Sequence, residues 1–348
     1  MSNTHSKYII IGAGLSGLTT ANQLQARGEH DFKVLESRAQ IGGRILTQGG
    51  VDLGATWFQN HHRYMATVLD QLKLKSFPQF SAGKSILVYN SMAPAHYFES
   101  DPNSPAAQRI ENGSETLIKA LAIGFQDKIE LNTKVIRITE DADKLLIQTN
   151  TDSYTCEKLI VTVPPKIVKN IQFVPELPEE LTPVLSKTHT WMSNAIKVGI
   201  TFETPFWRAN GLSGTVISQI SEVTELYDHS NASETEFSLM GFVNEGLREL
   251  TAADRKERIL TYLENYLGSD IRTYIHYEEK DWSIDPNTSC EELNSVYMSP
   301  SYGNKAFQAL YMNGKLVFSG TETSTVSGGY MDGAIYSGLQ AVALINKD

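Results

Sequence analysis

The chain is poor in cysteine, has no excess of positive charge and contains no long hydrophobic run, and each absence excludes a class of protein. Its 348 residues include only two cysteines, Cys156 and Cys290, which are too few and too far apart for a disulfide framework or a zinc motif. We therefore expect two free thiols, no metal site and a reducing, cytoplasmic compartment. Forty acidic residues against thirty basic ones give a net charge of −10, which argues against nucleic acid or an anionic membrane surface as a partner.

Signals for export and for membrane insertion are also missing. The segment Met1–Lys7 lacks the basic and apolar regions of a signal peptide. No segment reaches the roughly 18 consecutive apolar residues that a membrane span requires, and we expect no anchor at Asn346–Asp348. The sequence therefore predicts no membrane partner, and its length favours two structural units over one small core.

A glycine-rich motif near the N-terminus gives the first positive signal. The apolar run Lys7–Ile11 predicts a buried parallel strand, and apolar residues at helical spacing predict a helix over Leu15–Ala26. Between them, Gly12, Gly14 and Gly17 form G-x-G-x-x-G, in the strand-to-helix context that a dinucleotide-binding motif requires. The first glycine permits a tight turn, the second lets the backbone approach a pyrophosphate, and the third lets helix and strand pack closely. The helix N-terminus then favours an anion.

An acidic residue at the end of the next expected strand extends this motif. Glu36 follows the run Phe32–Leu35 and lies nineteen residues after Gly17, where a carboxylate accepts hydrogen bonds from the ribose of an adenosine. A carboxylate here disfavours a 2′-phosphate and therefore NADP, whereas NAD and FAD remain open. Two arginines follow, Arg38 and, behind a Gly-Gly turn, Arg44, which is able to reach back to a pyrophosphate.

Three separate segments resemble the flavin amine oxidase family, which includes the monoamine and polyamine oxidases. They are ESRAQIGGR at residues 36–44, VDLGATW at residues 51–57, where small residues leave room for a flat ring, and FSGTETSTVSGGYMDGAIYSG at residues 318–338. The resemblance implies an α/β fold, in which a Rossmann-like FAD/NAD(P)-binding domain of the GR2 type carries an inserted α+β substrate domain. The implied boundaries are residues 1–60, 109–165 and 303–348 for the FAD-binding domain, and 61–108 and 166–302 for the substrate domain.

The resemblance also implies which residues contact the cofactor. In the family, matching residues hold the adenosine and pyrophosphate, meet the adenine, lie beside the isoalloxazine ring and ribityl chain, or form the turn into the last helix. The residues concerned here are Gly12, Gly14, Leu15, Ser16 and Gly17; Glu36, Ser37, Arg38, Gly43 and Arg44; Gly54, Ala55, Thr56 and Trp57; Val135 and Val163; Gly320, Thr321 and Glu322; and Gly329, Tyr330 and Met331.

Three residues match positions that act on the substrate or on the flavin in the family. Lys197 lies eight residues before Pro205, which begins the sequence PFWR, and the family's lysine at this distance holds a water at the flavin N5 and assists the reaction with oxygen. Trp282 matches a tryptophan that packs on the flavin. Tyr330 matches one wall of an aromatic cage around the substrate amine, and such a ring attracts a cation. Without the resemblance, Lys197 would be expected to point to solvent, as most lysines do.

The sequence departs from the family in the covalent link to the flavin. Monoamine oxidases bind the flavin through a cysteine some nine residues after the matching tryptophan. Cys290 lies near that distance, but counting back from residues 298–300 places the family's cysteine at Asn294 and its second cage tyrosine at Ser295. We therefore predict non-covalent FAD, with Tyr297 or Tyr302 as candidates for the second wall.

The chain is also short in one region. Only about fifty residues separate Trp57 from the segment Glu111–Leu121, whereas family members usually have far more. This shortening predicts a smaller substrate domain, with a pocket that is shallow or is completed by a partner chain, as in a homodimer. Elsewhere the pattern predicts a short strand at Ile45–Thr47 and a crossing between domains at Ile171–Pro183, which contains three prolines.

The resemblance implies oxidation of an amine to an imine, with FAD as cofactor and oxygen as acceptor, which yields an aldehyde and hydrogen peroxide. Two alternatives remain open at this point. One is a desaturase or protoporphyrinogen-oxidase-like flavoenzyme, which takes an uncharged hydrophobic substrate; a pocket lined with apolar side chains, without a carboxylate near Tyr330, would favour it. The other is a flavin-binding accessory protein without enzymatic activity.

Overall fold

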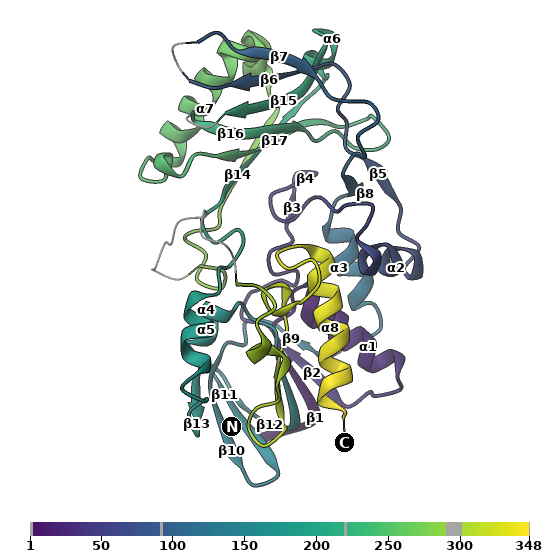
Figure 1. Ribbon diagram of the computed structural model, residues 1–348, viewed down its shortest axis with the longest axis vertical. Coiled ribbons are helices and arrows are strands. Elements are labelled where there is room, and N and C mark those ends of the chain that lie inside the picture. Colours follow the sequence, from purple (N-terminus) through teal and green to yellow (C-terminus); the bar gives the residue numbers. More distant parts are fainter. Residues whose placement is uncertain (1–2, 91–92, 219–220, 290–300, 348) are drawn as a thin grey trace.

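The protein is built on two large β-sheets, one at each end of an elongated molecule (Figure 1). A computed structural model describes residues 3–90, 93–218, 221–289 and 301–347. Within these residues no helix is long and apolar enough to cross a membrane. The calls on Cys290, Asn294, Ser295 and Tyr297 lie outside the described residues.

The first sheet has eight strands and contains the predicted N-terminal strand at its centre. Their order is β13 (Gln172–Val174), β10 (Val135–Asp141), β11 (Lys144–Thr149), β12 (Ser153–Val161), β1 (Asn3–Ile11), β2 (Phe32–Leu35) and β9 (Ile129–Glu130), and β19 (Leu316–Phe318) pairs with β12. Strand β1 runs parallel to both β2 and β12. Its residues 8–11 are all buried, which explains why this strand is apolar without alternation.

Helices cover both faces of this sheet. Ile10 packs with α1 (Leu15–Ala26), α2 (Arg63–Gln71), α3 (Glu115–Ala122) and α8 (Met331–Ile345) in one core. The next residue, Ile11, points to the opposite face and packs in a second core with α4 (Pro165–Val168) and α5 (Leu181–Lys187). Helix α8 runs beside α1 (Figure 1).

The second sheet has seven strands and belongs to the other end of the molecule (Figure 1). Their order is β18 (His276–Asp281), β14 (Ile196–Phe202), β17 (Phe237–Val243), β16 (Val223–Asp228), β15 (Leu212–Ser218), β6 (Lys84–Val88) and β7 (His96–Glu99). One face packs against α7 (Ala252–Leu267) in a core that includes Val198, Leu239 and Ile259. Thr251 caps α7 by accepting a hydrogen bond from the backbone N–H of Asp254.

Short elements complete the fold. They are the hairpin β3 (Thr47–Gln48) and β4 (Val51–Asp52), the pair β5 (Ser76–Pro78) and β8 (Gln108–Ile110), helix α6 (Phe206–Ala209), and the short 3₁₀ helices Gln126–Lys128, Glu245–Leu247, Ser269–Thr273, Lys305–Gln308 and Thr321–Thr323. The hairpin β3–β4 lies between the two sheets (Figure 1).

One sequence-based prediction of local structure is wrong. The strand expected at Ile45–Thr47 begins instead at Thr47, because Gly49 and Gly50 take positive φ angles of 56° and 77° and form a two-residue hairpin turn after Gln48. The segment Ile171–Pro183 contains strand β13 and the start of α5, with Phe173 and Leu181 buried in the core, and its role as a crossing between domains stays a prediction. The domain boundaries stay predictions.

The buried carboxylate of Asp228 generates a stability prediction. Asp228 accepts hydrogen bonds from Trp207 Nε1 at 2.8 Å and from Arg208 Nε at 2.7 Å, and its side chain is fully buried. Asp228→Ala would leave both donors without this partner, so we expect a loss of about 3–5 kcal/mol in the free energy of unfolding. Chemical denaturation measures this value.

A matched control removes the other carboxylate that Arg208 contacts. The side chain of Glu234 is 65% exposed, and Glu234→Ala is expected to cost less than about 1 kcal/mol. Equal losses in the two variants would contradict the special importance of Asp228.

Candidate active site

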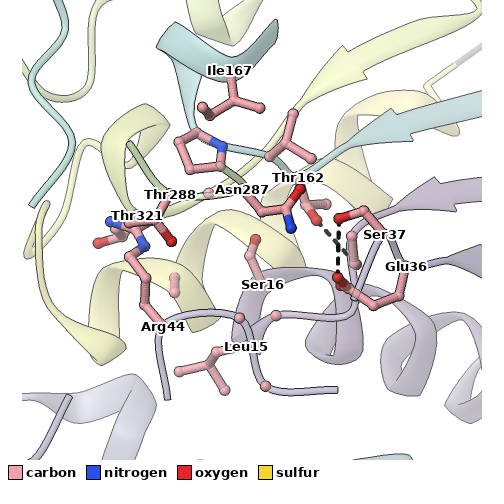
Figure 2. A pocket seen from close by; sticks show the side chains of 18 of the residues that line it. Leu15, Ser16, Glu36, Ser37, Arg44, Thr162, Ile167, Asn287, Thr288 and Thr321 are labelled. Carbon is pink, nitrogen blue, oxygen red and sulfur yellow. Dashed lines mark hydrogen bonds between the residues drawn. The ribbon is translucent and has the colours of Figure 1, made fainter. Parts of the chain in front are cut away.

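A cleft opens at the carboxyl ends of the central strands of the first sheet, the usual ligand position in an open α/β sheet (Figure 2). Ile11 and Leu35, which end β1 and β2, line it, as does Thr162, which follows β12. The cleft has a volume of about 1170 Å³ with its open mouth included.

The glycine motif forms the floor of this cleft, and its three glycines have different reasons to be glycine. A Cβ on Gly17 would lie 2.0 Å from the backbone oxygen of Gly12, and Gly12 itself has a φ of 104°. Gly14 differs because its φ is −76° and a Cβ there would make only an ordinary contact, 3.8 Å from Gly43 Cα. The neighbours of Gly14 thus leave room for a Cβ, and the close approach of its backbone to a pyrophosphate stays a prediction. No side chain caps helix α1, so its N-terminal N–H groups suit an anion.

Glu36 is fixed at the edge of the cleft by backbone donors. Its Oε2 accepts from the N–H of Ala13 at 2.7 Å and its Oε1 from the N–H of Arg38 at 2.8 Å. The side chain is 3% exposed, and Ser37 Oγ lies 3.3 Å away (Figure 2). Each carboxylate oxygen accepts more than one hydrogen bond, so this group fits the hydroxyls of a ribose.

The two predicted arginines line the cleft and are held by carboxylates of the protein. Arg44 forms a bidentate ion pair with Glu322 at 2.5 and 3.0 Å and donates to the carbonyl of Trp191 at 3.1 Å. Burial opposes the charge of Arg44, but Glu322 raises its pKa. Arg38 donates to Asp285 at 2.8 Å and to Thr288 at 2.9 Å. Arg44 thus stays charged, and both guanidinium groups lie at positions suited to an anionic cofactor.

Most of the predicted cofactor residues line this one cleft. They are Gly12, Gly14, Leu15, Ser16, Glu36, Ser37, Arg38, Gly43, Arg44, Ala55, Val135, Val163, Gly320, Thr321, Gly329, Tyr330 and Met331. Gly17, Gly54, Thr56, Trp57 and Glu322 do not line it, although Glu322 holds the lining residue Arg44. The sequence-based reasoning missed Thr162, Trp191, Met192, Asn287 and Thr288, which also line the cleft, because they belong to no motif.

Lys197 lies buried beside the hairpin β3–β4 and has three oxygen partners. Its Nζ lies 2.9 Å from the carbonyl oxygen of Asp52, 2.8 Å from that of Gly54 and 3.0 Å from Thr56 Oγ1. The side chain is 1% exposed. Burial lowers its pKa to about 7, with Asp52 acting in the opposite direction. Near neutral pH, Lys197 is therefore able to exist in charged and uncharged forms.

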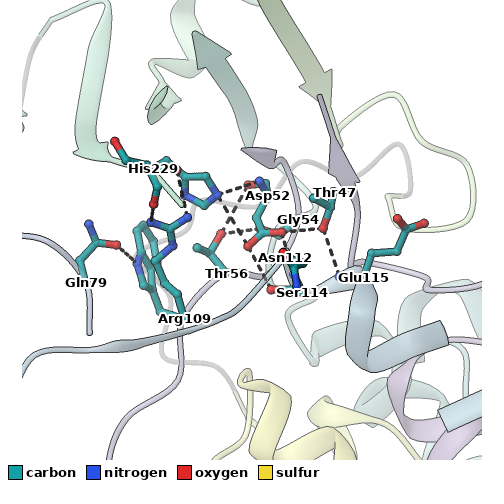
Figure 3. A network of polar contacts seen from close by, with 12 residues as sticks. Thr47, Asp52, Gly54, Thr56, Gln79, Arg109, Asn112, Ser114, Glu115 and His229 are labelled. Atoms are coloured by element: carbon teal, nitrogen blue, oxygen red, sulfur yellow. Dashed lines mark hydrogen bonds and ion pairs between the residues drawn. The ribbon is translucent and has the colours of Figure 1, made fainter. Parts of the chain in front are cut away.

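The partners of Lys197 belong to a buried polar network (Figure 3). Burial raises the pKa of Asp52, whose carboxylate accepts from Thr47 Oγ1 at 2.6 Å and from the N–H of Ser114 at 2.9 Å. The N–H of Asp52 donates to His229 Nε2 at 3.1 Å. Burial, followed by the charge of Arg109, keeps the pKa of His229 well below its usual range, so His229 is uncharged and acts as an acceptor. Arg109 donates to the carbonyl of His229 at 3.0 Å.

The two predicted aromatic residues occupy different environments. Trp282 is 1% exposed and donates through Nε1 to the carbonyl of Leu53 at 2.8 Å. Tyr330 is 52% exposed at the cleft, and its ring centroid lies 5.0 Å from that of His62. Tyr302 packs against the Gly328–Gly329 turn, so the second wall of an aromatic cage stays a prediction.

Comparisons with known proteins agree with this site. The sequence model of the family described as flavin containing amine oxidoreductase matches residues 15–103 and 88–346, and the chain belongs to that family. A probable flavin-containing monoamine oxidase A of Dictyostelium discoideum is 24% identical over 95% of both chains. An amine oxidase of Oncorhynchus mykiss is 29% identical over 70% of this chain but only 47% of its own length.

Solved structures show the same fold. Wild-type putrescine oxidase bound to putrescine matches with a TM-score of 0.85 at 21% identity, over 98% of this chain and 99% of that one. Cyclohexylamine oxidase from Brevibacterium oxydans matches with a TM-score of 0.84 at 19% identity, over 98% of both chains. Together with the family match, these findings confirm the predicted family, the α/β fold class, FAD as cofactor and an oxidoreductase that acts on amines.

Gly14 provides a test of the cofactor site. Because Gly14→Ala creates no clash within the protein, we expect an unchanged melting temperature for the protein without cofactor. Its Cβ would stand where the pyrophosphate approaches, so the Kd for FAD should rise at least about tenfold, a loss of roughly 1.4 kcal/mol. Flavin fluorescence titration measures the Kd.

Gly17→Ala is the matched comparison, since its Cβ would clash with Gly12 and should lower stability as well as FAD binding. Unchanged FAD affinity in Gly14→Ala would contradict the assignment of the cleft floor to the pyrophosphate.

Proposed function

We propose that this protein oxidises a primary or secondary amine to an imine, with oxygen as the electron acceptor. Bound FAD would supply the two-electron chemistry, with N5 as the acceptor of a hydride equivalent from the carbon next to the amine nitrogen, and hydrogen peroxide would be the product with oxygen. The residues of the chain hold the cofactor, place the amine and exclude water. The imine then hydrolyses to an aldehyde.

One observation carries this proposal: the sheet face that bears Lys197 also bears a carboxylate among aromatic rings. Lys197 on β14 pairs in register with Phe242 on β17, and Phe242 pairs with Glu225 on β16. The three residues therefore form one row on one face of the sheet. The ring centroid of Phe242 lies 5.0 Å from Lys197 Nζ.

Glu225 is held in place by a neighbouring tyrosine. Tyr227 OH donates to Glu225 Oε2 at 2.9 Å, and the Tyr227 ring lies 5.0 Å from that of Trp57. Burial, followed by the charge of Glu225, raises the pKa of Tyr227, so Tyr227 stays a donor. A carboxylate flanked by aromatic faces suits a cationic amine.

This carboxylate distinguishes the proposed function from the alternatives. A desaturase or protoporphyrinogen-oxidase-like enzyme binds an uncharged hydrophobic substrate, for which a partly buried Glu225 would be unfavourable. An accessory protein without activity would have no need of Lys197 buried beside the segment expected to face the flavin ring. A non-covalent flavin, a cytoplasmic location and a homodimer stay predictions from the sequence.

An anaerobic titration tests the function directly. The FAD-loaded protein is mixed with a panel of monoamines and diamines while the yellow flavin absorbance is followed. We expect one class of amine to bleach the absorbance, and air to restore it. Absorbance that dithionite bleaches but no amine does would overturn the proposal in favour of an uncharged substrate or an accessory role.

Lys197→Met tests the role proposed for Lys197 in the reaction with oxygen. The variant should retain FAD, because Lys197 does not line the cofactor cleft. We expect reoxidation by oxygen to slow by about 10²-fold, the usual effect of removing one placed donor, with a smaller effect on reduction by the amine. Stopped-flow absorbance measures both steps, and unchanged reoxidation would remove Lys197 from the proposal.

Glu225→Gln tests recognition of the cationic amine. The change keeps the size of the side chain and removes its charge, so we expect KM to rise about tenfold with little change in kcat, as for lost uniform binding. Glu222→Gln is the matched control, because Glu222 pairs with Arg258 on the surface and should leave KM unchanged. An equal KM in both variants would contradict the role of Glu225.

A further inference from the structure

The three partners of Lys197 are not equivalent as hydrogen-bonding groups. The ammonium form has three N–H donors, and each has an oxygen at 2.8 to 3.0 Å. The uncharged amine has two N–H donors and one lone pair, which requires a donor in return. The carbonyls of Asp52 and Gly54 only accept, whereas the Thr56 hydroxyl both accepts and donates.

The hydrogen of the Thr56 hydroxyl has an acceptor whether Lys197 is charged or uncharged. When the lysine is charged, Thr56 accepts from Nζ and its own hydrogen faces the carbonyls of Gly54 at 3.3 Å and Asp52 at 3.4 Å. When the lysine is uncharged, rotation of the hydroxyl directs the same hydrogen to the lone pair of Nζ at 3.0 Å. Every group at this point therefore keeps a partner in both states, which a buried site requires.

The two carbonyls are fixed, so only the hydroxyl has to move. The N–H of Asp52 is held by His229 Nε2 at 3.1 Å, and the N–H of Gly54 donates to the carbonyl of Leu46 at 3.1 Å (Figure 3). Gly54 has no room to shift toward its neighbours, because a Cβ there would lie 2.2 Å from the carbonyl oxygen of Arg44.

The charged groups around Lys197 come from several elements, and some of them raise its pKa while others lower it. Asp52 on β4 and Glu225 on β16 favour the ammonium form, while Arg109 on β8 and burial disfavour it. His229, which follows β16, is held uncharged. This balance leaves neither form of Lys197 strongly preferred near neutral pH.

We propose that Thr56 is a positioning residue that lets Lys197 gain and lose one proton in place, by reversing the direction of the hydrogen bond between Thr56 Oγ1 and Lys197 Nζ. Resting on the proposed function, the use of this exchange follows from the balance of the reaction: the hydride taken from the amine carries both electrons and one hydrogen, so the reduction of oxygen to hydrogen peroxide needs one further proton. Lys197 then holds a proton inside a site that excludes water.

The pKa of Lys197 in the FAD-loaded protein tests the proposal. It is measured by NMR on protein labelled with ¹³C at the lysine Cε, and the signal missing from Lys197→Met identifies Lys197. Thr56→Val keeps the shape but removes the hydroxyl. We expect its Lys197 pKa to fall by about 0.5–1 unit, because the ammonium loses a charge-assisted bond that is stronger than the bond lost by the amine.

Thr56→Ser is the matched control, since it retains the hydroxyl and should restore the wild-type pKa. An unchanged pKa in Thr56→Val, or the same shift in Thr56→Ser, would overturn the proposal.

The pH profile of flavin reoxidation separates this inference from the proposed function. We expect its apparent pKa to shift in Thr56→Val in parallel with the NMR value. A shifted NMR pKa with an unshifted reoxidation profile would support the exchange at Thr56 and exclude Lys197 from the reaction with oxygen.

Discussion

The burial of Asp52 is the constraint on which the rest of the site depends. Its carboxylate binds the start of helix α3 through Ser114, its N–H binds His229, which follows β16, and its carbonyl binds Lys197 on β14. A buried carboxylate requires such partners, because leaving it unpaired is costly. The same residue thus links helix α3, which packs in the core of the first sheet, to the second sheet and positions the lysine there. The hydrogen bonds of Asp52 thus contribute to stability and also position Lys197.

The parts of the fold and site that the sequence predicted are those built from local motifs. The glycine turn, Glu36 and the helix that follows lie within about 25 residues of each other, and their geometry follows from backbone sterics and helix ends alone. Strands β15 and β16 were missed because their apolar residues alternate irregularly around a bulge. The hairpin β3–β4 was misplaced by two residues because both of its turn glycines carry positive φ.

Contacts between distant segments explain what the sequence did not reveal. Arg44 was expected to face a pyrophosphate, yet its ion pair with Glu322 joins residues 278 positions apart. Thr56 was expected beside the flavin ring, and its bond to Lys197 spans 141 positions. His229, Arg109 and Glu225 belong to no motif, and only the register of the second sheet brings Glu225 into line with Lys197. Such pairings depend on topology, which spacing along the chain does not encode.

The row that contains Lys197 and Glu225 continues across the second sheet. Beyond Glu225 it passes through Ile217 on β15, Leu87 on β6 and His96 on β7. Neighbouring strands lie about 4.8 Å apart, so each step along the row adds that distance from the lysine. The row therefore places its successive side chains at regular distances from Lys197 across one face of the sheet.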